Sequence, residues 1–374
     1  MKKHISLLAS LLCLGTTALA NSPYISEVYD FMPAPGQFTN TIPEYENGDT
    51  QASMNAKCKE YLAGQARGSM VCLGAYGGYI VFGFDHAVAN KPGEYDLKIY
   101  GNAFAASGRD DGGSAEPGIV MVSYDANGNG IPDDAWYELA GSDYSKSTTF
   151  HNYEITYYKP SGTEPDSTYI RWTSNDPADP MGYVERNQFH RQDYWPGWAE
   201  GNTLTFRGTR LGHNAIREEG GNWFLRFLDW GYVDNRPNGE DPGFKLDWAV
   251  DAQGNPVHLD KVHFIKVHTG VNQTCGWLGE TSTEIIGAED LHPEYAGISG
   301  IESGNTLRLL GVTAGQLQLD NGTDVPLSAD LYDLQGRHVR TLAIQPGYAT
   351  YDLNGLTPGA YLLRAAGHTF KILV

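Results

Sequence analysis

Glycine and proline recur so often along this chain that long helices are excluded from most of it. The 374 residues include 45 glycines and 19 prolines, and only 19% of the residues are charged. Glycine weakens helices and proline ends them, whereas both are common in the tight turns between short strands. Aromatic residues, which favour strands, make up 12% of the chain. The composition therefore predicts an all-β fold.

Short apolar or alternating runs bounded by turn residues mark the predicted strands. They cover residues 78–84, 95–100, 118–124, 154–158, 168–172, 203–207, 223–230 and 262–269. A short helix is expected within residues 58–66, and a long polar and aromatic loop over residues 174–202. We expect a main domain at residues 21–296, a glycine-rich linker at 297–305 and a small terminal module at 306–374.

The first twenty residues have the pattern of a secretory signal peptide. Lys2 and Lys3 precede an apolar run at residues 5–14, and Ala18 and Ala20 supply the small residues that a signal peptidase requires. No later segment has the roughly eighteen uninterrupted apolar residues that a membrane-spanning helix needs. The sequence therefore predicts an exported protein whose mature chain starts at Asn21.

The excess of acidic residues argues against nucleic acid or an anionic membrane as a partner. The formal net charge is −19, from 45 acidic and 26 basic residues. Such a surface repels phosphate groups but is compatible with solubility and with divalent cations.

Three cysteines remain after the signal peptide, namely Cys58, Cys72 and Cys275. In an oxidising compartment an odd number allows one disulfide and one free thiol as the simplest outcome. Pairing of Cys72 with Cys58 would close a short loop, and pairing of Cys72 with Cys275 would join the two ends of the main domain. The sequence leaves both pairings open.

Residues 125–134, here called the Asp125 loop, have the spacing of a calcium-binding loop. The candidate ligands are Asp125, Asn127, Asn129, the carbonyl of Ile131, Asp133 and Asp134. The first three stand at alternate positions, and Gly130 allows a sharp turn at the sixth. The acid that usually occupies position twelve is replaced by Trp136. An Asn-Gly hairpin turn would explain part of the pattern, but four oxygen side chains in phase favour a structural Ca2+.

A second set of polar residues lies next to predicted strands rather than within one motif. It comprises Asn102, Glu116 and Asp247. Glu116 lies among small residues just before Pro117, which is an unusual place for an acid that only faces solvent. We expect the three side chains to share a second cation or a ligand pocket. Polar residues at strand edges that bond to backbone amides would give the same pattern.

Aromatic and basic residues gather in the long loop at residues 174–202. The candidates for ligand binding are Tyr183, Arg186, Tyr194, Trp195 and Trp198. Flat aromatic faces with hydrogen-bonding neighbours stack on sugar rings, corrin-like planes or peptide side chains. Trp223, Trp230 and Trp248 lie in strand-like runs and are assigned to the core.

Sequence signatures of catalysis are weak. The chain has no metalloprotease helix motif, no nucleophile elbow and no phosphate-binding loop. Glu116 paired with Asp247 or Glu280 could serve glycoside hydrolysis, but 45 acidic residues offer many such pairs. No catalytic residue is assigned.

The terminal module has a distinctive order of strands and turns. Residues 331–334 and 338–344 alternate apolar and polar side chains about a Gln335-Gly336 turn, and a further strand follows Pro358-Gly359. A short basic and apolar segment ends the chain. This order resembles the C-terminal sorting domain of the bacterial type IX secretion system, an immunoglobulin-like β-sandwich. The resemblance implies the type IX translocon and sortase as partners, and a location on the surface of, or outside, an outer-membrane bacterium.

Several segments of the main domain form a second distinctive pattern together with the Asp125 loop. They are residues 72–86, 100–104, 115–123, 271–284 and 287–292. The pattern resembles a family of secreted bacterial cell-surface proteins without a well-established activity. The resemblance implies a large jelly-roll-like β-sandwich that contains calcium. Some members of the family look like neighbours of outer-membrane cobalamin-uptake systems, which implies an uptake receptor as a partner.

We therefore expect an exported cell-surface binding protein that is not an enzyme. Its ligand would be a glycan or a planar nutrient such as a corrinoid, with structural Ca2+ and without nucleic acid. An extracellular glycoside hydrolase, or another polysaccharide-active enzyme, is one alternative. A structural surface or adhesion component is another.

Overall fold

A computed structural model of the protein describes residues 21–295, 307–313, 315–322, 325–365 and 368–374. The predicted signal peptide and the predicted linker lie outside these residues. Within them the fold consists of antiparallel sheets packed as β-sandwiches, with a single α-helix. The predicted all-β class is confirmed. No helix in these ranges has the length and apolar character needed to cross a membrane.

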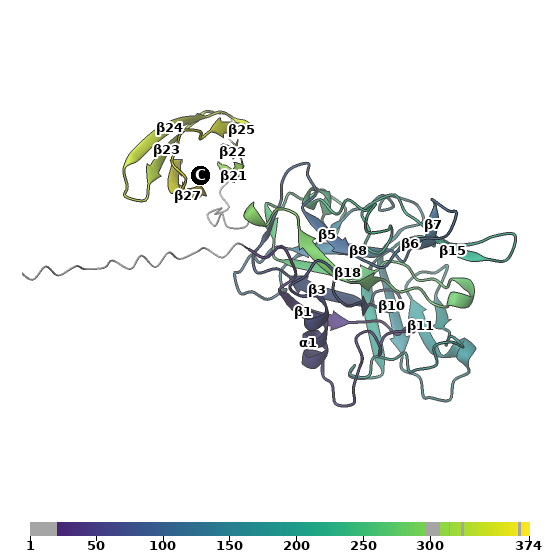
Figure 1. The fold of residues 1–374 in the computed structure, drawn as a ribbon. Helices are drawn as coiled ribbons and strands as arrows, with labels where there is room; N and C mark the ends of the chain where they lie inside the picture. Colours follow the sequence, from purple (N-terminus) through teal and green to yellow (C-terminus); the bar gives the residue numbers. More distant parts are fainter. Residues whose placement is uncertain (1–20, 296–306, 314, 323–324, 366–367) are drawn as a thin grey trace, which may run out of the picture.

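A six-stranded antiparallel sheet lies at the centre of the main domain (Figure 1). Its strands, in order across the sheet, are β1 (Glu27–Met32), β3 (Tyr79–Gly83), β18 (Phe264–Thr269), β8 (Gly118–Ser123), β9 (Trp136–Leu139) and β16 (Ala249–Val250). Strands β3, β8 and β18 are apolar along most of their length because both faces of the sheet are covered. The edge strand β1 comes from residues 21–51, here called the lead segment, where no strand was predicted.

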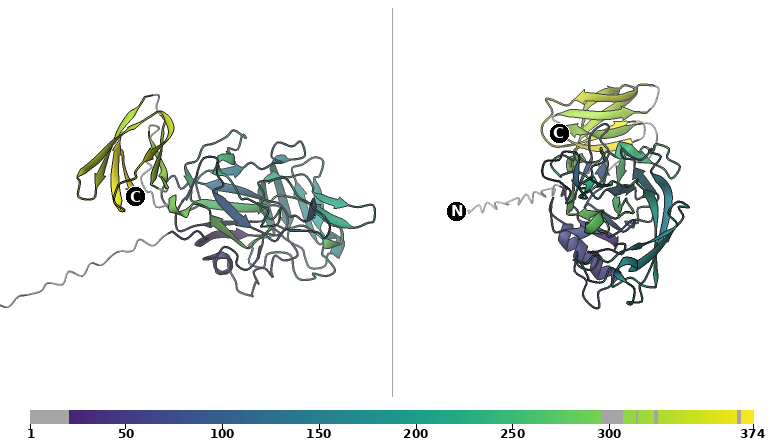
Figure 2. Two further views of the ribbon diagram at one scale, coloured as in Figure 1. Left: turned by 45° about the horizontal axis from the view of Figure 1, so that its top comes forward. Right: turned by 90° about the vertical axis from the view of Figure 1, so that its right-hand side faces the viewer.

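A four-stranded sheet packs against the central sheet to form the sandwich (Figure 2). Its strands are β12 (Met181–Val184), β11 (Ile170–Ser174), β10 (Phe150–Tyr158) and β13 (Thr203–Arg210). Aromatic side chains fill the space between the two sheets. Tyr79 of β3 meets Phe206 of β13 edge to face, with ring centroids 6.4 Å apart. Such aromatic contacts add stability beyond the burial of their surface.

Helix α1 (Gln51–Leu62) contributes to the core on the other side of the central sheet, where it buries Met54, Cys58 and Leu62. It begins earlier than predicted because Thr50 caps it, with the Thr50 side chain accepting a hydrogen bond from Ser53 N.

Shorter elements complete the main domain. A four-stranded sheet consists of β14 (Ala215–Arg217), β15 (Trp223–Arg226), β7 (Gly112–Ser114) and β6 (Phe104–Ala105). Three pairs join β17 (Lys261–Val262) to β4 (Val88–Ala89), β19 (Glu284–Ile285) to β2 (Val71–Cys72), and β20 (Gly287–Asp290) to β5 (Leu97–Tyr100). Single 3-10 turns are η1 (Asp166–Thr168), η2 (Leu246–Trp248), η3 (Gly276–Leu278) and η4 (Pro293–Tyr295). Elements β7, β15, β19 and η3 each contribute to the cavity described below.

The C-terminal module is a small sandwich with its own core. One sheet contains β21 (Arg308–Thr313), β22 (Gln316–Asn321) and β25 (Gly347–Asp352). The other contains β24 (His338–Ile344), β23 (Leu327–Asp333), β26 (Ala360–Ala365) and β27 (His368–Leu373). Leu331, Ile344 and Leu363 are fully buried between them. The predicted hairpin about Gln335-Gly336 is confirmed as the β23–β24 pair.

The three cysteines of the described residues, Cys58, Cys72 and Cys275, are all free and buried. The expectation of one disulfide is therefore wrong in this structure. The three thiols lie in different parts of the domain. Cys58 lies on α1, Cys72 Sγ is 3.3 Å from Ser282 Oγ, and Cys275 belongs to a separate apolar cluster.

Candidate functional site

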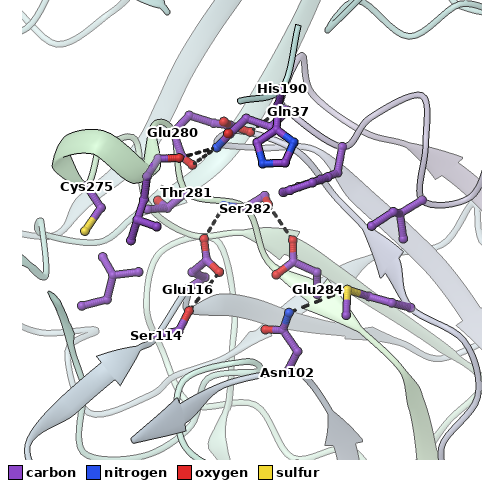
Figure 3. A pocket seen from close by; sticks show the side chains of 15 residues that line it. Gln37, Asn102, Ser114, Glu116, His190, Cys275, Glu280, Thr281, Ser282 and Glu284 are labelled. Carbon is purple, nitrogen blue, oxygen red and sulfur yellow. Dashed lines mark hydrogen bonds between the residues drawn. The ribbon is translucent and has the colours of Figure 1, made fainter. Parts of the chain in front are cut away.

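A cavity of about 360 Å3 lies where several short elements of the main domain meet (Figure 3). Gln37 comes from the lead segment, Ser114 and Glu116 from β7 and the following loop, and much of the remaining wall from residues 278–284. Distant segments are bonded directly here, since Gln37 N donates to Glu280 Oε1 at 2.8 Å across 243 positions of the sequence. The long-range pairing of the fold therefore builds this cavity.

Three carboxyl groups converge at the cavity. Glu116 and Glu284 line it, and Asp234 lies beside them and is buried. One carboxylate oxygen from each of the three lies within 4.8 Å of the other two. In Figure 3 the side chains of Glu116 and Glu284 extend into the same space below Ser282. We call Glu116, Asp234 and Glu284 the acidic triad.

The backbone around Asp234 fixes the geometry of the triad. Asp234 has a φ of +55°, in the left-handed region that most residues avoid. Its Oδ1 accepts a hydrogen bond from Asn102 N at 2.7 Å, and its Oδ2 accepts one from Glu284 N at 2.9 Å. Gly101 allows this close approach, because a Cβ at that position would lie 2.6 Å from Asp234 Oδ1.

Ser282 holds the other two carboxyl groups in place. Its backbone N donates to Glu116 Oε1 at 3.0 Å, and its Oγ donates to Glu284 Oε1 at 2.6 Å. A longer contact of 3.4 Å links Ser114 Oγ to Glu116 Oε2. Backbone and hydroxyl donors thus orient all three carboxyls toward one another.

Burial raises the pKa of each triad carboxyl well above its usual range. Desolvation is the largest cause, and repulsion from a neighbouring triad carboxylate is the next. Burial also raises the pKa of Glu280, on the cavity wall, to about 8. Within the described ranges, none of these four acids forms an ion pair with Lys, Arg or His. No protein cation therefore compensates the cluster.

Four further oxygen atoms of the cavity wall are buried and have no hydrogen-bond partner. They are Gln37 Oε1, Asn102 Oδ1, Glu280 Oε2 and Thr281 Oγ1. Buried polar atoms are nearly always satisfied in folded proteins. Four such atoms around one cavity indicate a site suited to a polar or positively charged occupant.

The second set of predicted polar residues is only partly brought together. Asn102 and Glu116 line the same cavity, as expected. Asp247 does not, and this part of the prediction is wrong. Its carboxylate accepts hydrogen bonds from Asn90 Nδ2 at 3.1 Å and from Gly93 N at 2.8 Å, and so stabilises a loop elsewhere.

Asp234 and Glu284 take the place expected for Asp247, and sequence reasoning missed both. Neither belongs to a local motif. Glu284 lies inside one of the segments that carry the family resemblance, which was the only available signal. Asp234 reaches the site because Val233 pairs with Gly118 in an isolated bridge, and no spacing rule predicts that contact.

The Asp125 loop connects β8 to β9 and folds so that its polar side chains face one another. Asp125 accepts hydrogen bonds from Asn129 N at 3.1 Å and Gly130 N at 2.9 Å. The side-chain amides of Asn127 and Asn129 donate to Asp133 at 3.2 and 3.0 Å. The predicted ligand side chains are therefore neighbours, as a calcium loop requires.

The remaining predicted ligands of the Asp125 loop lie close by. Asp134 Oδ2 accepts from Ala126 N at 3.0 Å, and the Ile131 carbonyl accepts from Asp133 N at 2.8 Å. Most of the loop is exposed to solvent. Calcium binding at this loop stays a prediction.

Residues 174–202 were predicted as one long loop but contain strand β12, and the rest of the segment is folded against the sandwich. Tyr194, Trp195 and Trp198 are 0%, 1% and 8% exposed. Trp198 stacks on Phe31 of β1, with ring centroids 5.8 Å apart. The prediction that these three rings bind a ligand is therefore corrected, because core packing covers their faces.

The other two residues predicted to bind a ligand differ from each other. The Arg186 guanidinium lies 3.6 Å from the centroid of the Tyr169 ring and forms an ion pair with Asp166 at 3.6 Å. Tyr183, on β12, is 39% exposed and lines a second cavity of about 200 Å3. Glu280 belongs to the walls of both cavities, so only Tyr183 of the five is both exposed and near the site.

An exposed aromatic pair adjoins the larger cavity. Phe189 and Trp277 are 64% and 66% exposed and meet edge to face at 6.4 Å. Their neighbours in sequence, His190 and Leu278, line the cavity. Asn187 Nδ2 donates to Leu278 O at 2.9 Å and ties the two segments together. Sequence analysis did not select this pair, since composition cannot distinguish an exposed ring from the buried ones nearby.

No protein-family model matches the chain, and no curated protein is significantly similar to it. The chemistry must therefore be inferred from the site itself. Clustered carboxyls in a cavity could bind a cation, accept hydrogen bonds from hydroxyl groups or transfer protons.

Proposed function

We propose that this protein is an exported cell-surface binding protein that captures a glycan, or a planar nutrient such as a corrinoid, without changing it chemically. The observation that carries the proposal is the position of the exposed pair Phe189 and Trp277 beside the cavity. Aromatic faces stack on the apolar faces of sugars and on planar rings. Unpartnered oxygens inside the cavity offer acceptors to hydroxyl groups.

The size and the polarity of the cavity favour a sugar unit as the inserted group. A volume of about 360 Å3 is small for a ligand site. The acceptors Gln37 Oε1 and Thr281 Oγ1 match the hydroxyl donors of a sugar ring. A larger macrocycle would be held mainly by the exposed aromatic pair.

The two chain ends support the export part of the proposal. Residues 1–20 have a signal-peptide pattern, and the terminal module resembles a type IX sorting domain. The translocon and sortase of that system would place the main domain on the cell surface, where an outer-membrane uptake receptor could receive the ligand. A chain that ends at residue 305 is then expected to remain inside the outer membrane, and its normal appearance at the surface would contradict this part.

Calcium in the Asp125 loop completes the proposal. The candidate ligands are Asp125, Asn127, Asn129, Ile131, Asp133 and Asp134, whose side chains or carbonyls lie in one short loop. The ion would hold the β8–β9 connection in shape and take no part in ligand capture.

The binding proposal is tested by replacing both exposed rings. Stacking on an aromatic ring is worth about 0.5–1.5 kcal/mol. The double variant Phe189→Ala with Trp277→Ala should therefore bind at least about 5-fold more weakly in calorimetric titrations with an oligosaccharide panel and with cobalamin. Trp230→Ala is the matched control, because Trp230, which was wrongly assigned to the core, is 42% exposed, packs on Trp248 and does not line the cavity.

Two outcomes would change the binding proposal. Unchanged affinity in the double variant would remove the aromatic pair from the binding site. Failure of every ligand to bind the wild-type chain would favour a structural or adhesive role.

Catalysis is the remaining alternative, and one observation favours it. Glu116 and Glu284 are close together and have raised pKa values, as a general acid requires. Release of products from the same oligosaccharide panel, lost in Glu116→Gln, would establish a hydrolase instead.

A further inference from the structure

We propose that the acidic triad binds a divalent cation, Ca2+, inside the cavity, through Glu116, Asp234 and Glu284 with Asn102 Oδ1 as a fourth ligand. This site is separate from the Asp125 loop. It would be assembled from four segments of the main domain and would form part of the wall against which the captured ligand binds.

The convergence of three carboxyl groups is the first observation that favours a positively charged occupant. Asp234 and Glu284 are 3% and 4% exposed, and their carboxylate oxygens lie within 4.8 Å of one another and of Glu116. Burial of an ionised carboxylate without a partner is strongly unfavourable. None of the three has a cationic side chain as a partner among the described residues. A bound cation would supply the missing charge.

The hydrogen bonds of the triad leave its carboxylate oxygens able to bind a cation. Asp234 accepts from two backbone N–H groups, and Glu116 Oε1 accepts from Ser282 N. A backbone N–H group can only donate, so it contacts a carboxyl oxygen through a lone pair and not through the hydroxyl hydrogen of a protonated acid. Each of these oxygens retains a second lone pair for a metal ion.

Unpartnered oxygens in the same wall are the second and independent observation. Glu280 and Thr281 are 8% and 2% exposed, and Glu280 Oε2 and Thr281 Oγ1 have no hydrogen-bond partner. Asn102 Oδ1 is also unpartnered, and the backbone N of the same residue donates to Asp234. Figure 3 places these side chains around one space. A hydrated cation would satisfy them, directly or through its waters.

The oxygen atoms around the cavity indicate which metal ion would bind. Carboxylate, amide and hydroxyl oxygens are ligands of hard cations, and Ca2+ accepts six to eight of them in flexible geometry. Cys275 and His190 also line the cavity, but neither belongs to the group of converging ligand atoms. A set of three carboxylates gives an excess of negative charge, which further favours a divalent ion over a monovalent one.

The cation would also bind the captured ligand. Three carboxylates and one amide leave coordination positions for water, and the cavity beside them has room for a small group. Paired hydroxyl groups of a sugar can replace such waters. This part rests on the proposed function, whereas the cation site itself does not.

Calcium titration without any other ligand tests the site. The mature chain, residues 21–374, is freed of metal and titrated with Ca2+ in a calorimeter. We expect two sites in the wild type. Asp125→Ala should retain the cavity site, and Glu284→Gln should weaken that site at least about 10-fold while it retains the loop site. Glu138→Gln, which changes a partly buried acid on β9 outside both sites, is the matched control and should retain two calcium sites.

The result for Asp125→Ala decides the question even if Glu284→Gln does not fold. Absence of any calcium site in Asp125→Ala would overturn the cavity site. Tighter binding of Zn2+ than of Ca2+ in this variant would overturn the choice of metal.

Whether the cavity cation binds the captured ligand is tested by a separate measurement. In Asp125→Ala, chelation is expected to weaken oligosaccharide binding at least about 10-fold, because only the cavity ion is then removed. Binding that does not change with chelator would overturn coordination of the ligand, although the calcium titration would still stand. Failure of all ligands to bind would refute the proposed function and not the cation site.

Discussion

The Asp125 loop and the acidic triad are both groups of oxygen ligands, but they are built in opposite ways. The loop is one stretch of ten residues at the surface, where water can solvate its carboxylates if no cation is present. The triad comes from residues up to 168 positions apart and is largely buried, so water solvates its carboxylates less well there than at the loop. A cation at the loop would therefore hold only the β8–β9 connection in shape, whereas a cation at the triad would stabilise the whole main domain.

The largest predicted effect is the stabilisation of the main domain by calcium at the triad. It is measured in Asp125→Ala by urea unfolding, with and without chelator. Calcium at about 1,000 times its dissociation constant should raise the free energy of unfolding by about 4 kcal/mol. The physical reason is that the unfolded chain lacks the assembled site. If chelator changes the free energy of unfolding of Asp125→Ala by less than about 0.5 kcal/mol, the triad does not stabilise the domain more than the loop does.

A smaller effect is predicted for calcium at the loop. It is measured as the difference in chelator response between Glu284→Gln and the double variant that also carries Asp125→Ala, since both variants retain the same weakened cavity site. We expect about 1–2 kcal/mol, because weaker binding at an exposed loop gives a lower ratio of calcium to its dissociation constant. If calcium at the loop stabilises the protein as much as calcium at the triad, burial of a site does not determine how much its calcium contributes to stability. The double variant should respond less to chelator than either single variant.

Local patterns in the sequence predicted the parts of the molecule that fold from neighbouring residues. The strand β8, the Asp125 loop after it and the hairpin β23–β24 were all predicted from alternation and turn chemistry. In each case the residues that decide the structure lie within about ten positions of one another. The edge strand β1 was missed because its pairing with β3 depends on a segment about fifty residues away.

The candidate site could be predicted only in part, for the same reason. Glu116 stood out because an acid before Pro117 is unusual, and Asn102 because it follows a strand. No sequence pattern marked Asp234, because only the folded chain brings it next to Glu284. The rings of Tyr194 and Trp195 matched the pattern of a binding loop, yet their burial depends on how residues 174–202 fold back on the sandwich. Sequence patterns identify which side chains could act, and long-range packing decides which of them are accessible.

The smallest predicted effect concerns Glu138, a single partly buried acid that belongs to neither site. Its Oε2 accepts a hydrogen bond from Thr209 Oγ1 at 2.6 Å, and burial raises its pKa to about 7. The unfolded chain releases this proton near pH 4.5, so the folded state holds the proton more tightly and loses stability as the pH rises from about 4.5 to 7. Glu138→Gln keeps an acceptor for Thr209 but cannot ionise. In chelator, the variant should therefore gain about 1 kcal/mol relative to the wild type between pH 5 and pH 8, after allowance for partial exposure. Urea unfolding at both pH values measures this, and a difference that does not change with pH would show that burial alone does not control this carboxyl.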